Sequence, residues 1–504
     1  MRMPKFSQLP RTILFACLAA SIIFFLAIGI ASVAYPYDLN YGEAQIVDQA
    51  HRAVTGQPQY KSDLSLPPYV IANYPPLYPL LVGAAGLVSR LPLVQVGRAL
   101  SLLSALLAAA LVGAFASDLS RRRYAGLLAA GLFLGNFYVL VWAPLARVDM
   151  LGLALSLGGL WLIYRRWRSW VWLGVAVLCL VAAIYTRQSY ILAAPAAAAI
   201  WLWHNDRPRA VWFAGALAIA VAVIFVLLNS LTRGGFYINT VWVNALSAFH
   251  LDKVTTQGWT LLMVWPFAII LAGVGLATVI RPAKQEAAGA NRDDGGLAFL
   301  RYGLLPYTVA ALLTGLTVGK IGSDVNYLLE MIAALAIWAG IGATRWPERR
   351  YLGRSIVFIL LTGQVLLSLL LGWRVVGVGH LNSWRHLTEY DRVFARVRAA
   401  APHGPILADD YLGMVVLAGQ PIYFQPFDYR QLYAAGKWDP SGLIGEIKSR
   451  RFPLILLNSR GSRFFDERWI PSIVEAIDAS YCPSESVGDL VLYEPATPPC
   501  GLAP

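Results

Sequence analysis

The chain repeatedly carries apolar runs that are long enough to cross a lipid bilayer, and this pattern limits its fold more than any other feature. About 20 apolar residues in a helix span the hydrocarbon core, and such runs recur along roughly three quarters of the chain. Hydrophobic residues make up 58% of the 504 residues and charged residues only 14%, which excludes an ordinary soluble protein. The sequence therefore predicts a polytopic α-helical membrane protein.

Eleven helices are predicted to cross the membrane. Their ranges are 12–34, 97–117, 124–142, 149–164, 170–186, 189–204, 210–230, 259–280, 301–319, 328–344 and 355–373. With the N-terminus in the cytoplasm, the cytoplasmic connections hold 19 lysines and arginines and the outer connections hold 9. The positive-inside rule therefore predicts a cytoplasmic N-terminus and an outer C-terminus. The net charge of +13 is explained by basic cytoplasmic loops that are attracted to anionic headgroups, rather than by binding of nucleic acid.

This orientation can be tested with epitope tags placed at Ala288 and after the last residue. The first tag falls in a predicted cytoplasmic linker, "KQEAAGANRDDGG", and the second follows the predicted outer part of the chain. We expect protease or antibody access to report them on opposite sides of the membrane. Tags on the same side would contradict the eleven-span arrangement.

One further apolar stretch, Pro75–Pro92, is too short to count as a span. It has about 14 uninterrupted apolar residues, whereas a crossing helix needs about 20. We interpret it as an interfacial or re-entrant helix within one long external loop, residues 35–96.

The composition changes after about Val375. Short apolar runs such as "PILAD", "PIYFQPF", "FPLILLNS" and "DLVLYEP" alternate with amphipathic stretches such as "PSGLIGEIKSRR" and "PSIVEAIDAS". This rhythm predicts an extracytoplasmic α/β domain over residues 376–504, following a membrane domain over residues 1–375. Cys482 and Cys500 flank its last predicted hairpin and could form a disulfide outside the cytoplasm.

Polar residues that are costly near hydrocarbon gather on the predicted outer rim of the membrane. They are Asp38 and Glu43 after the first span, Arg147 and Asp149 before the fourth, Arg187 after the fifth, and Lys320 and Tyr327 near the tenth. Ionisable groups placed so close to lipid are usually functional. Carboxylates and cations on one rim predict a chamber for an anionic, membrane-borne ligand.

Four segments in this order resemble the GT-C superfamily of integral-membrane glycosyltransferases, in the branch of protein O-mannosyltransferases and lipid A aminoarabinose transferases. They are "YDLNYGEA", "NYPPLYPLL", "ARVDMLGLALSL" and "YTRQSYILAAP", and the resemblance covers residues 10–375. The segment "ILADDYLGMVVLAGQPIYFQPFDYRQLYAAGKWDP" is similar to the external tails of bacterial members. Relatives often have adjacent Asp and Glu in the first motif, where this chain has Gly42 and Glu43 with Asp38 upstream.

The resemblance implies an enzyme of the bacterial inner membrane that moves a sugar from a polyprenyl-phosphate donor to an acceptor hydroxyl outside the cytoplasm, with inversion. Membrane lipids, the lipid-linked sugar and a glycan, lipid or protein acceptor are the expected partners. The acceptor must lose a proton, so a carboxylate base is needed. Glu43 is the predicted base, with Asp38 and Asp149 as the other catalytic carboxylates. Arginine grips phosphate oxygens with two parallel hydrogen bonds, so donor-phosphate binding is assigned to Arg187, Arg147, Lys320 and Tyr327.

Each of these residues also has an ordinary structural explanation. Glu43 could be a helix-start residue, and Asp38 or Asp149 could cap a helix. Arg187 and Lys320 could extend to lipid headgroups, and Tyr327 could belong to the aromatic belt. The residues Asp48, His51 and Arg52 are expected on the polar face of an interfacial helix, and Asp409 and Asp410 in a turn or helix cap.

A transporter, or a protein that handles lipid-linked polysaccharide without transferring sugar, is the alternative function. Transporters place charged residues near the bilayer midplane and often contain repeats, and neither feature is evident in this sequence. The metal question stays open, because no close spacing of His, Cys and Asp ligands supports assigning a metal site.

Overall fold

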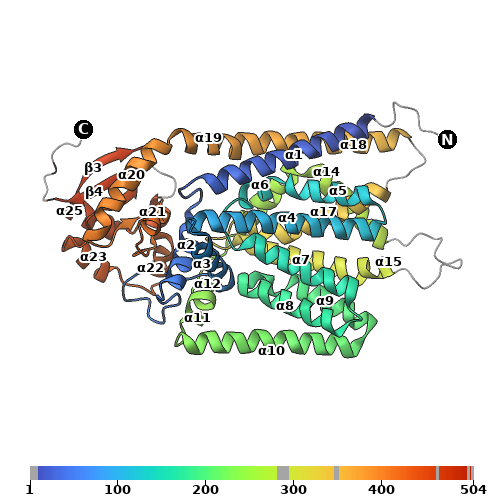
Figure 1. The fold of residues 1–504 in the computed structure, drawn as a ribbon, viewed down its shortest axis with the longest axis horizontal. Coiled ribbons are helices and arrows are strands. Elements are labelled where there is room, and N and C mark those ends of the chain that lie inside the picture. The colour runs from blue at the N-terminus through green and yellow to red at the C-terminus, as the bar shows by residue number, and fades with distance from the viewer. Residues whose placement is uncertain (1–8, 281–294, 346–350, 461–464, 497–499, 501–504) are drawn as a thin grey trace.

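The computed structural model describes residues 9–280, 295–345, 351–460, 465–496 and 500. Ala288, chosen above for a tag, lies outside the described residues. Long helices run side by side as a bundle (Figure 1). They are α1 (Leu9–Ala34), α4 (Leu93–Ser120), α5 (Arg123–Leu134), α7 (Asp149–Arg166), α8 (Trp170–Thr186), α9 (Ala193–Asn205), α10 (Arg207–Leu231), α14 (Pro266–Ile280), α16 (Leu305–Leu316), α17 (Leu329–Arg345) and α18 (Tyr351–Gly372). A further helix, α13 (Leu251–Val264), leads into α14 at a steep angle.

The described residues contain six helices that are long and apolar enough to cross a membrane, or seven if one bent pair counts as a span. The bent pair is α13 and α14, which meet at 93°, so the span predicted at 259–280 is broken. Pro266 explains the break, because a proline lacks a backbone N–H and disfavours helical geometry in the residue before it. The count of eleven spans stays a prediction.

Helix α10 shows why the bundle requires a membrane. It lies at the edge of the bundle (Figure 1), and only 11% of its apolar 18-residue stretch is buried inside the protein. Exposed side chains include Val211 and Ile219 near its start and middle, and Val226 and Leu227 near its end. A continuous apolar surface of this kind is unfavourable in water and favourable against lipid. The chain is therefore an integral membrane protein.

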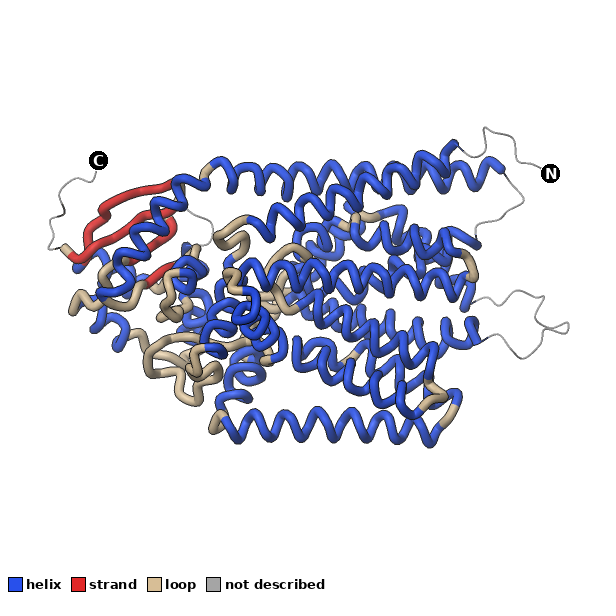
Figure 2. Tube along the Cα trace, in the orientation of Figure 1, coloured by secondary structure: helices blue, strands red, loops and turns tan. Residues whose placement is uncertain are grey.

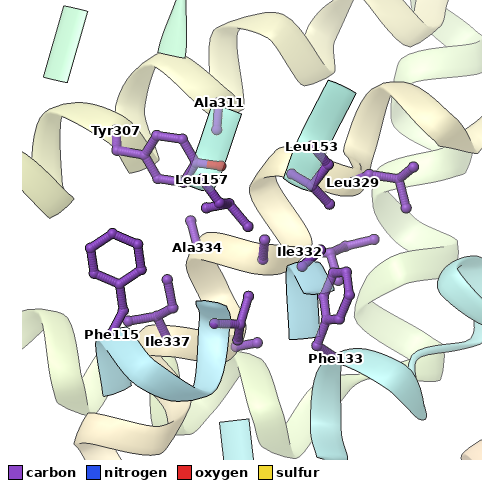
Figure 3. Close-up of a cluster of buried hydrophobic side chains, with 14 of the residues drawn as sticks. Phe115, Phe133, Leu153, Leu157, Tyr307, Ala311, Leu329, Ile332, Ala334 and Ile337 are labelled. Carbon is purple, nitrogen blue, oxygen red and sulfur yellow. The ribbon is translucent and has the colours of Figure 1, made fainter. Parts of the chain in front are cut away.

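The core of the bundle is apolar and closely packed. Side chains from α4, α5, α7, α16 and α17 meet there, among them Phe115, Phe133, Leu157, Tyr307 and Ile332 (Figure 3). Helices α14 and α17 approach each other so closely that a Cβ atom at Gly342 would lie 3.0 Å from the backbone carbon of Leu271. Small residues allow such contacts in membrane helices.

One end of the bundle carries short helices and loops (Figures 1 and 2). Here α2 (Tyr41–Val54) and α3 (Leu77–Ser89) lie near α11 (Gly235–Tyr237) and α12 (Val243–Ala245). Helix α3 corresponds to the short apolar stretch in the predicted external loop. At 13 residues it is about 20 Å long, which is less than the hydrocarbon thickness of about 30 Å.

The C-terminal part contains a four-stranded sheet at the same end (Figure 2). Its strands are β1 (Leu407–Ala408), β2 (Ile455–Asn458), β3 (Tyr481–Val487) and β4 (Leu490–Pro495), in the order β1-β2-β4-β3. Strands β1 and β2 are parallel, and the other pairs are antiparallel. The accompanying helices are α20 (Leu387–Ala400), α21 (Leu412–Leu417), α22 (Pro426–Ala434), α23 (Ser441–Lys448), α24 (Phe465–Arg468) and α25 (Pro471–Ser480). Cys482 and Cys500 form a disulfide.

The boundary and one strand differ from the sequence prediction. Helix α18 continues through a π-helical turn and α19 (Val378–Arg385), so residue 376 lies inside a continuous helical run. The run "PIYFQPF", predicted as a strand, leads into α22 instead. Phe424 within it forms an isolated parallel bridge with Tyr69, which lies between α2 and α3. Its backbone groups therefore pair with the membrane part rather than with the sheet.

The C-terminal part is held on α2 by buried polar contacts. Asp48 pairs with Arg52 at 2.6 Å and accepts from the Ile422 backbone N–H at 2.8 Å. Arg52 donates to the Ile422 carbonyl oxygen at 2.8 Å, and Gln45 donates to Asp428 at 2.6 Å. Asp48 and Arg52 were expected on the polar face of an interfacial helix, and the docked C-terminal part buries both side chains.

Candidate functional site

Helix α2 places Glu43 in its first turn. Asn40 is the N-cap, and the Glu43 carboxylate completes a capping box by accepting from the backbone N–H groups of Leu39 at 2.8 Å and Asn40 at 3.2 Å. Arg98 donates two hydrogen bonds to this carboxylate, from Nε and Nη2, both at 2.8 Å. The Ala146 N–H donates another at 2.7 Å. The carboxylate therefore accepts five hydrogen bonds.

These contacts make Glu43 a weak base. Burial raises the pKa of its carboxyl group, but the charge and hydrogen bonds of Arg98 outweigh burial and hold the pKa below its usual range. Every strong donor around Glu43 stabilises the ionised form, which opposes proton uptake. The geometry supports a structural role, and the predicted role as base rests on the sequence motif alone.

Arg98 is a site residue that the sequence analysis missed. It is fully buried in α4 and also donates to the carbonyl oxygens of Ser32 at 2.8 Å, Tyr35 at 2.7 Å and Tyr37 at 2.6 Å. Arg98 therefore connects the end of α1 with the start of α2. One feature of the sequence indicated a role for Arg98. It lies at the edge of a predicted span, and an arginine so close to lipid needs a polar or charged partner.

The substitution Glu43→Gln is expected to destabilise the protein. Removing one partner of a buried ion pair leaves the other charge uncompensated, at a cost of about 3–5 kcal/mol. The measurement is thermal unfolding of the purified protein in detergent, with Glu475→Gln on the exposed surface of α25 as the control. An unchanged unfolding temperature in Glu43→Gln would contradict the structural role.

Asp149 and Arg187 form a second buried pair at the same end of the bundle. Asp149 begins α7, and its Oδ1 accepts from Arg187 and, at 3.0 Å, from the Asn326 side chain. Its Oδ2 accepts from the Trp142 indole N–H at 2.6 Å. The Arg187 guanidinium carbon lies 4.2 Å from the centre of the Tyr327 ring. The structure thus brings together three of the predicted residues in one contact group.

Arg147 lies beside this pair. Its Nε is 4.0 Å from Asp149 Oδ2, and its Nη2 donates to the Tyr74 hydroxyl at 3.0 Å. The guanidinium also faces the rings of Tyr74 and Trp142. It passes so close to Gly42 that a Cβ atom there would lie 2.7 Å from Arg147 Cζ. The departure from the family motif at position 42 therefore has a steric explanation in this chain.

Two donors of these arginines are buried without a hydrogen-bond partner among the described residues. They are Nε of Arg147 and Nη2 of Arg187. Buried polar atoms are almost always hydrogen-bonded, so an unpaired donor on a buried cation indicates a place for an acceptor. Both guanidinium groups contact Asp149, so one anion could accept from both.

Lys320 lies at the margin of this group. Its side chain is half-buried and lies close enough to Tyr327 for an electrostatic interaction. A second lysine, Lys253, donates to the carbonyl oxygens of Ser323 and, at 3.2 Å, Lys320. Lys253 holds the backbone around Lys320, a role that no motif in the sequence indicates.

Asp38 follows α1 and is the least constrained carboxylate of the site. Its Oδ2 accepts from the Gly413 backbone N–H at 2.7 Å, and its Oδ1 has no hydrogen-bond partner in the described part of the chain. Burial, followed by the negative charge of Glu43, raises the pKa of Asp38 to about 7. A general base works best with a pKa near the working pH. Asp38 has the free oxygen and the basicity that Glu43 lacks.

Asp409 and Asp410 were expected in a turn or helix cap and lie in the turn after β1. Both contact Arg468, at 2.9 and 2.6 Å, and the Arg468 guanidinium lies 4.2 Å from the Tyr41 ring centre.

No group of three or more His, Cys, Asp or Glu side chains arranged to hold a metal occurs within the ranges that the structure describes.

Solved structures of other proteins share this fold. ArnT from Cupriavidus metallidurans in the apo state aligns with a TM-score of 0.63 at 12% identity, over 94% of this chain and 97% of that chain. The same protein bound to undecaprenyl phosphate aligns with a TM-score of 0.59 at 13% identity, over 94% and 97%.

An archaeal oligosaccharyltransferase is a further structural neighbour. AglB from Archaeoglobus fulgidus, in complex with an inhibitory peptide and a dolichol-phosphate, aligns with a TM-score of 0.50 at 10% identity, over 96% of this chain and 75% of that chain. The sequence matches no protein-family model and no curated protein. At these identities the likeness establishes a shared fold.

Proposed function

We propose, from the premise that this chain has the fold of the GT-C superfamily, that it is a membrane glycosyltransferase with a lipid-linked donor. ArnT and AglB both belong to that superfamily, so the predicted resemblance is confirmed at the level of the fold. The proposed donor is a sugar on a polyprenyl phosphate, and the proposed acceptor is a hydroxyl group outside the cytoplasm. The proposed location is the bacterial inner membrane, with an extracytoplasmic α/β domain formed by the C-terminal part.

One observation carries the proposal: the unpartnered buried donors of Arg147 and Arg187. Two guanidinium groups beside one carboxylate suit a phosphate, because planar guanidinium groups match phosphate oxygens. The neighbouring ArnT structure contains undecaprenyl phosphate, which has the chemistry expected of the leaving group. The Tyr327 ring makes a cation–π contact with the Arg187 guanidinium, and Lys320 adds a positive charge nearby.

The proposed reaction is a single displacement. The acceptor oxygen attacks the anomeric carbon, the bond from that carbon to the phosphate oxygen breaks, and the polyprenyl phosphate leaves with the electron pair. A carboxylate on the acceptor side takes the hydroxyl proton. Attack opposite the leaving group inverts the anomeric centre. Arg147 and Arg187 stabilise the charge that develops on the phosphate.

The three carboxylates have different roles in this proposal. Asp38 is the base, because it has an unpaired oxygen and a pKa near neutrality. Asp149 orients Arg187 through their ion pair. Glu43, the base predicted from the motif, holds α2 against α4 through Arg98.

The decisive test uses purified protein and a radiolabelled polyprenyl-phosphate sugar. In detergent, we expect labelled sugar to move to an added hydroxyl acceptor or to water, with release of polyprenyl phosphate. In sealed vesicles, intact donor that crosses the bilayer without release of sugar would instead identify a transporter. Absence of both transfer and hydrolysis across a set of donor sugars would contradict the proposal.

A further inference from the structure

The segment that follows β1, residues 409–413, consists of a turn and the first two residues of α21 and is called the 409–413 loop. Buried polar contacts fix its start. Asp409 is fully buried and accepts from the Trp469 indole N–H at 2.8 Å and from Arg468 at 2.9 Å. Asp410 accepts from the Asn458 side chain at 2.5 Å. The donors are Asn458 of β2, Arg468 of α24, and Trp469, which follows α24. The start of the loop is therefore held in place by hydrogen bonds to β2 and to residues that follow it.

Tyr411, in the middle of this loop, has an unfavourable backbone conformation. Its φ of 62° and ψ of 28° lie in the left-handed region, which bulky residues rarely adopt. The centre of its ring lies 4.9 Å from the centre of the Tyr390 ring of α20. Backbone strain of this kind persists only where surrounding contacts impose it, and it is concentrated at functional sites.

Gly413, the second residue of α21, contacts the proposed base, Asp38. Its N–H donates to Asp38 Oδ2 at 2.7 Å, across 375 positions of the chain. A Cβ atom at this position would lie 2.7 Å from Asp38 Cγ and would overlap the carboxylate oxygens. Only glycine allows the backbone to approach Asp38 so closely.

We infer that residues 409–413 form part of the transfer site, where Gly413 positions the Asp38 carboxylate and shields it from water. The strained backbone, the missing Cβ and the hydrogen bond all lead to the same carboxylate. The inference rests on the proposed function, because it assumes that Asp38 accepts the acceptor proton. The C-terminal part then contributes a positioning residue and is more than a docking module.

The surroundings of Asp38 explain what the loop changes. Glu43, Asp410 and Tyr35 face it with negative or ionisable oxygens, and Arg98 faces it with a positive charge. Burial is the largest cause of its raised pKa, and the Gly413 N–H acts in the opposite direction. Moving the loop away would therefore admit water, lower the pKa of Asp38 and weaken the base.

The test is Gly413→Ala in the full chain, with Gly445→Ala as the matched control. A Cβ atom at Gly445 meets nothing within 4 Å, and this residue lies in α23. We expect Gly413→Ala to bind donor with parental affinity and to transfer sugar about 10²-fold more slowly. We also expect the acidic limb of its pH–rate profile to move from about 7 toward the ordinary aspartate value of about 3.9.

A second measurement does not depend on turnover. Dicyclohexylcarbodiimide reacts with protonated carboxyl groups, so mass spectrometry of the Asp38 peptide after labelling at several pH values reports the pKa. We expect labelling up to about pH 7 in the parent and in Gly445→Ala, and only at lower pH in Gly413→Ala. An unchanged labelling profile in Gly413→Ala would overturn the inference.

A second variant covers the case in which Gly413→Ala does not fold. Tyr411→Gly relieves the left-handed backbone and removes the contact with Tyr390, so it loosens the loop without a clash. We expect its acidic limb and its labelling profile to move in the same direction. If Gly413→Ala fails to bind donor, Tyr411→Gly decides alone, and a parental profile overturns the inference. A parent protein that neither transfers nor hydrolyses the labelled donor instead contradicts the proposed function.

Discussion

Asp38→Asn is expected to lower the rate of sugar transfer by about 10²–10⁴-fold, the usual cost of losing a general base. Asparagine keeps the shape and can still accept from Gly413, but it cannot take a proton. Donor binding should stay at the parental affinity, because Arg147 and Arg187 are the residues proposed to contact the phosphate. The measurements are single-turnover transfer rates and equilibrium donor binding in one preparation at matched protein concentration.

The pH dependence gives an independent check on the same residue. The pKa of Asp38 is raised to about 7, and only its ionised form can act as base. Parental transfer should therefore rise as the pH increases through about 7 and level off above it. Asp38→Asn should lose this limb.

Glu43→Gln distinguishes between the two candidate carboxylates in the segment that joins α1 to α3, Asp38 and Glu43. Where the variant remains folded, we expect it to retain far more activity than Asp38→Asn. The opposite order, with Asp38→Asn at the parental rate and folded Glu43→Gln inactive, would return the role of base to Glu43. Full activity in both would place the base outside this segment.

Arg187→Ala is expected to weaken donor binding and to lower the maximal transfer rate together. Arg187 would contact the phosphate before and during bond breaking, and removing a donor from a developing negative charge costs about 10²–10³-fold in rate. The measurements are donor affinity and kcat under saturating donor. Arg233→Gln, which removes an exposed arginine after α10, is the control for a general loss of positive charge.

A double variant separates phosphate binding from folding. Arg187→Ala leaves the buried Asp149 carboxylate without the nearer of its two cations, which destabilises the protein by itself. Arg187→Gln combined with Asp149→Asn removes both charges, so we expect it to unfold at a higher temperature than Arg187→Ala. Its donor affinity should remain low. Parental donor affinity in the double variant would exclude Arg187 from the phosphate site.

Several features of the fold and site were predictable from local sequence. The apolar runs predict helices in a membrane because hydropathy depends on neighbouring residues only, and α1, α4, α10 and α17 lie where such runs occur. The polar residues at one set of ends of these runs predicted that Asp149, Arg187 and Tyr327 lie in one group. Charges are excluded from hydrocarbon, so they collect where helices end, and the structure places these three in contact.

Other features depend on contacts between distant parts of the chain. The motif by itself suggested Glu43 as the base, because a carboxylate beside a span looks available until its partners are known. Arg98, 55 positions away, takes up that carboxylate. The run "PIYFQPF" has the composition of a strand, but it pairs with Tyr69, between α2 and α3, rather than with the sheet.

Local sequence is sufficient to predict that the protein lies in a lipid bilayer, that its apolar runs are helical and that its polar residues gather at one end of the bundle. Which carboxylate keeps an unpaired oxygen depends on the packing of distant segments. Proton affinity depends on burial and on the charges and donors within a few ångströms, and folding brings those groups from far along the chain. Gly413 reaches Asp38 across 375 positions, and no local pattern in either segment predicts that contact.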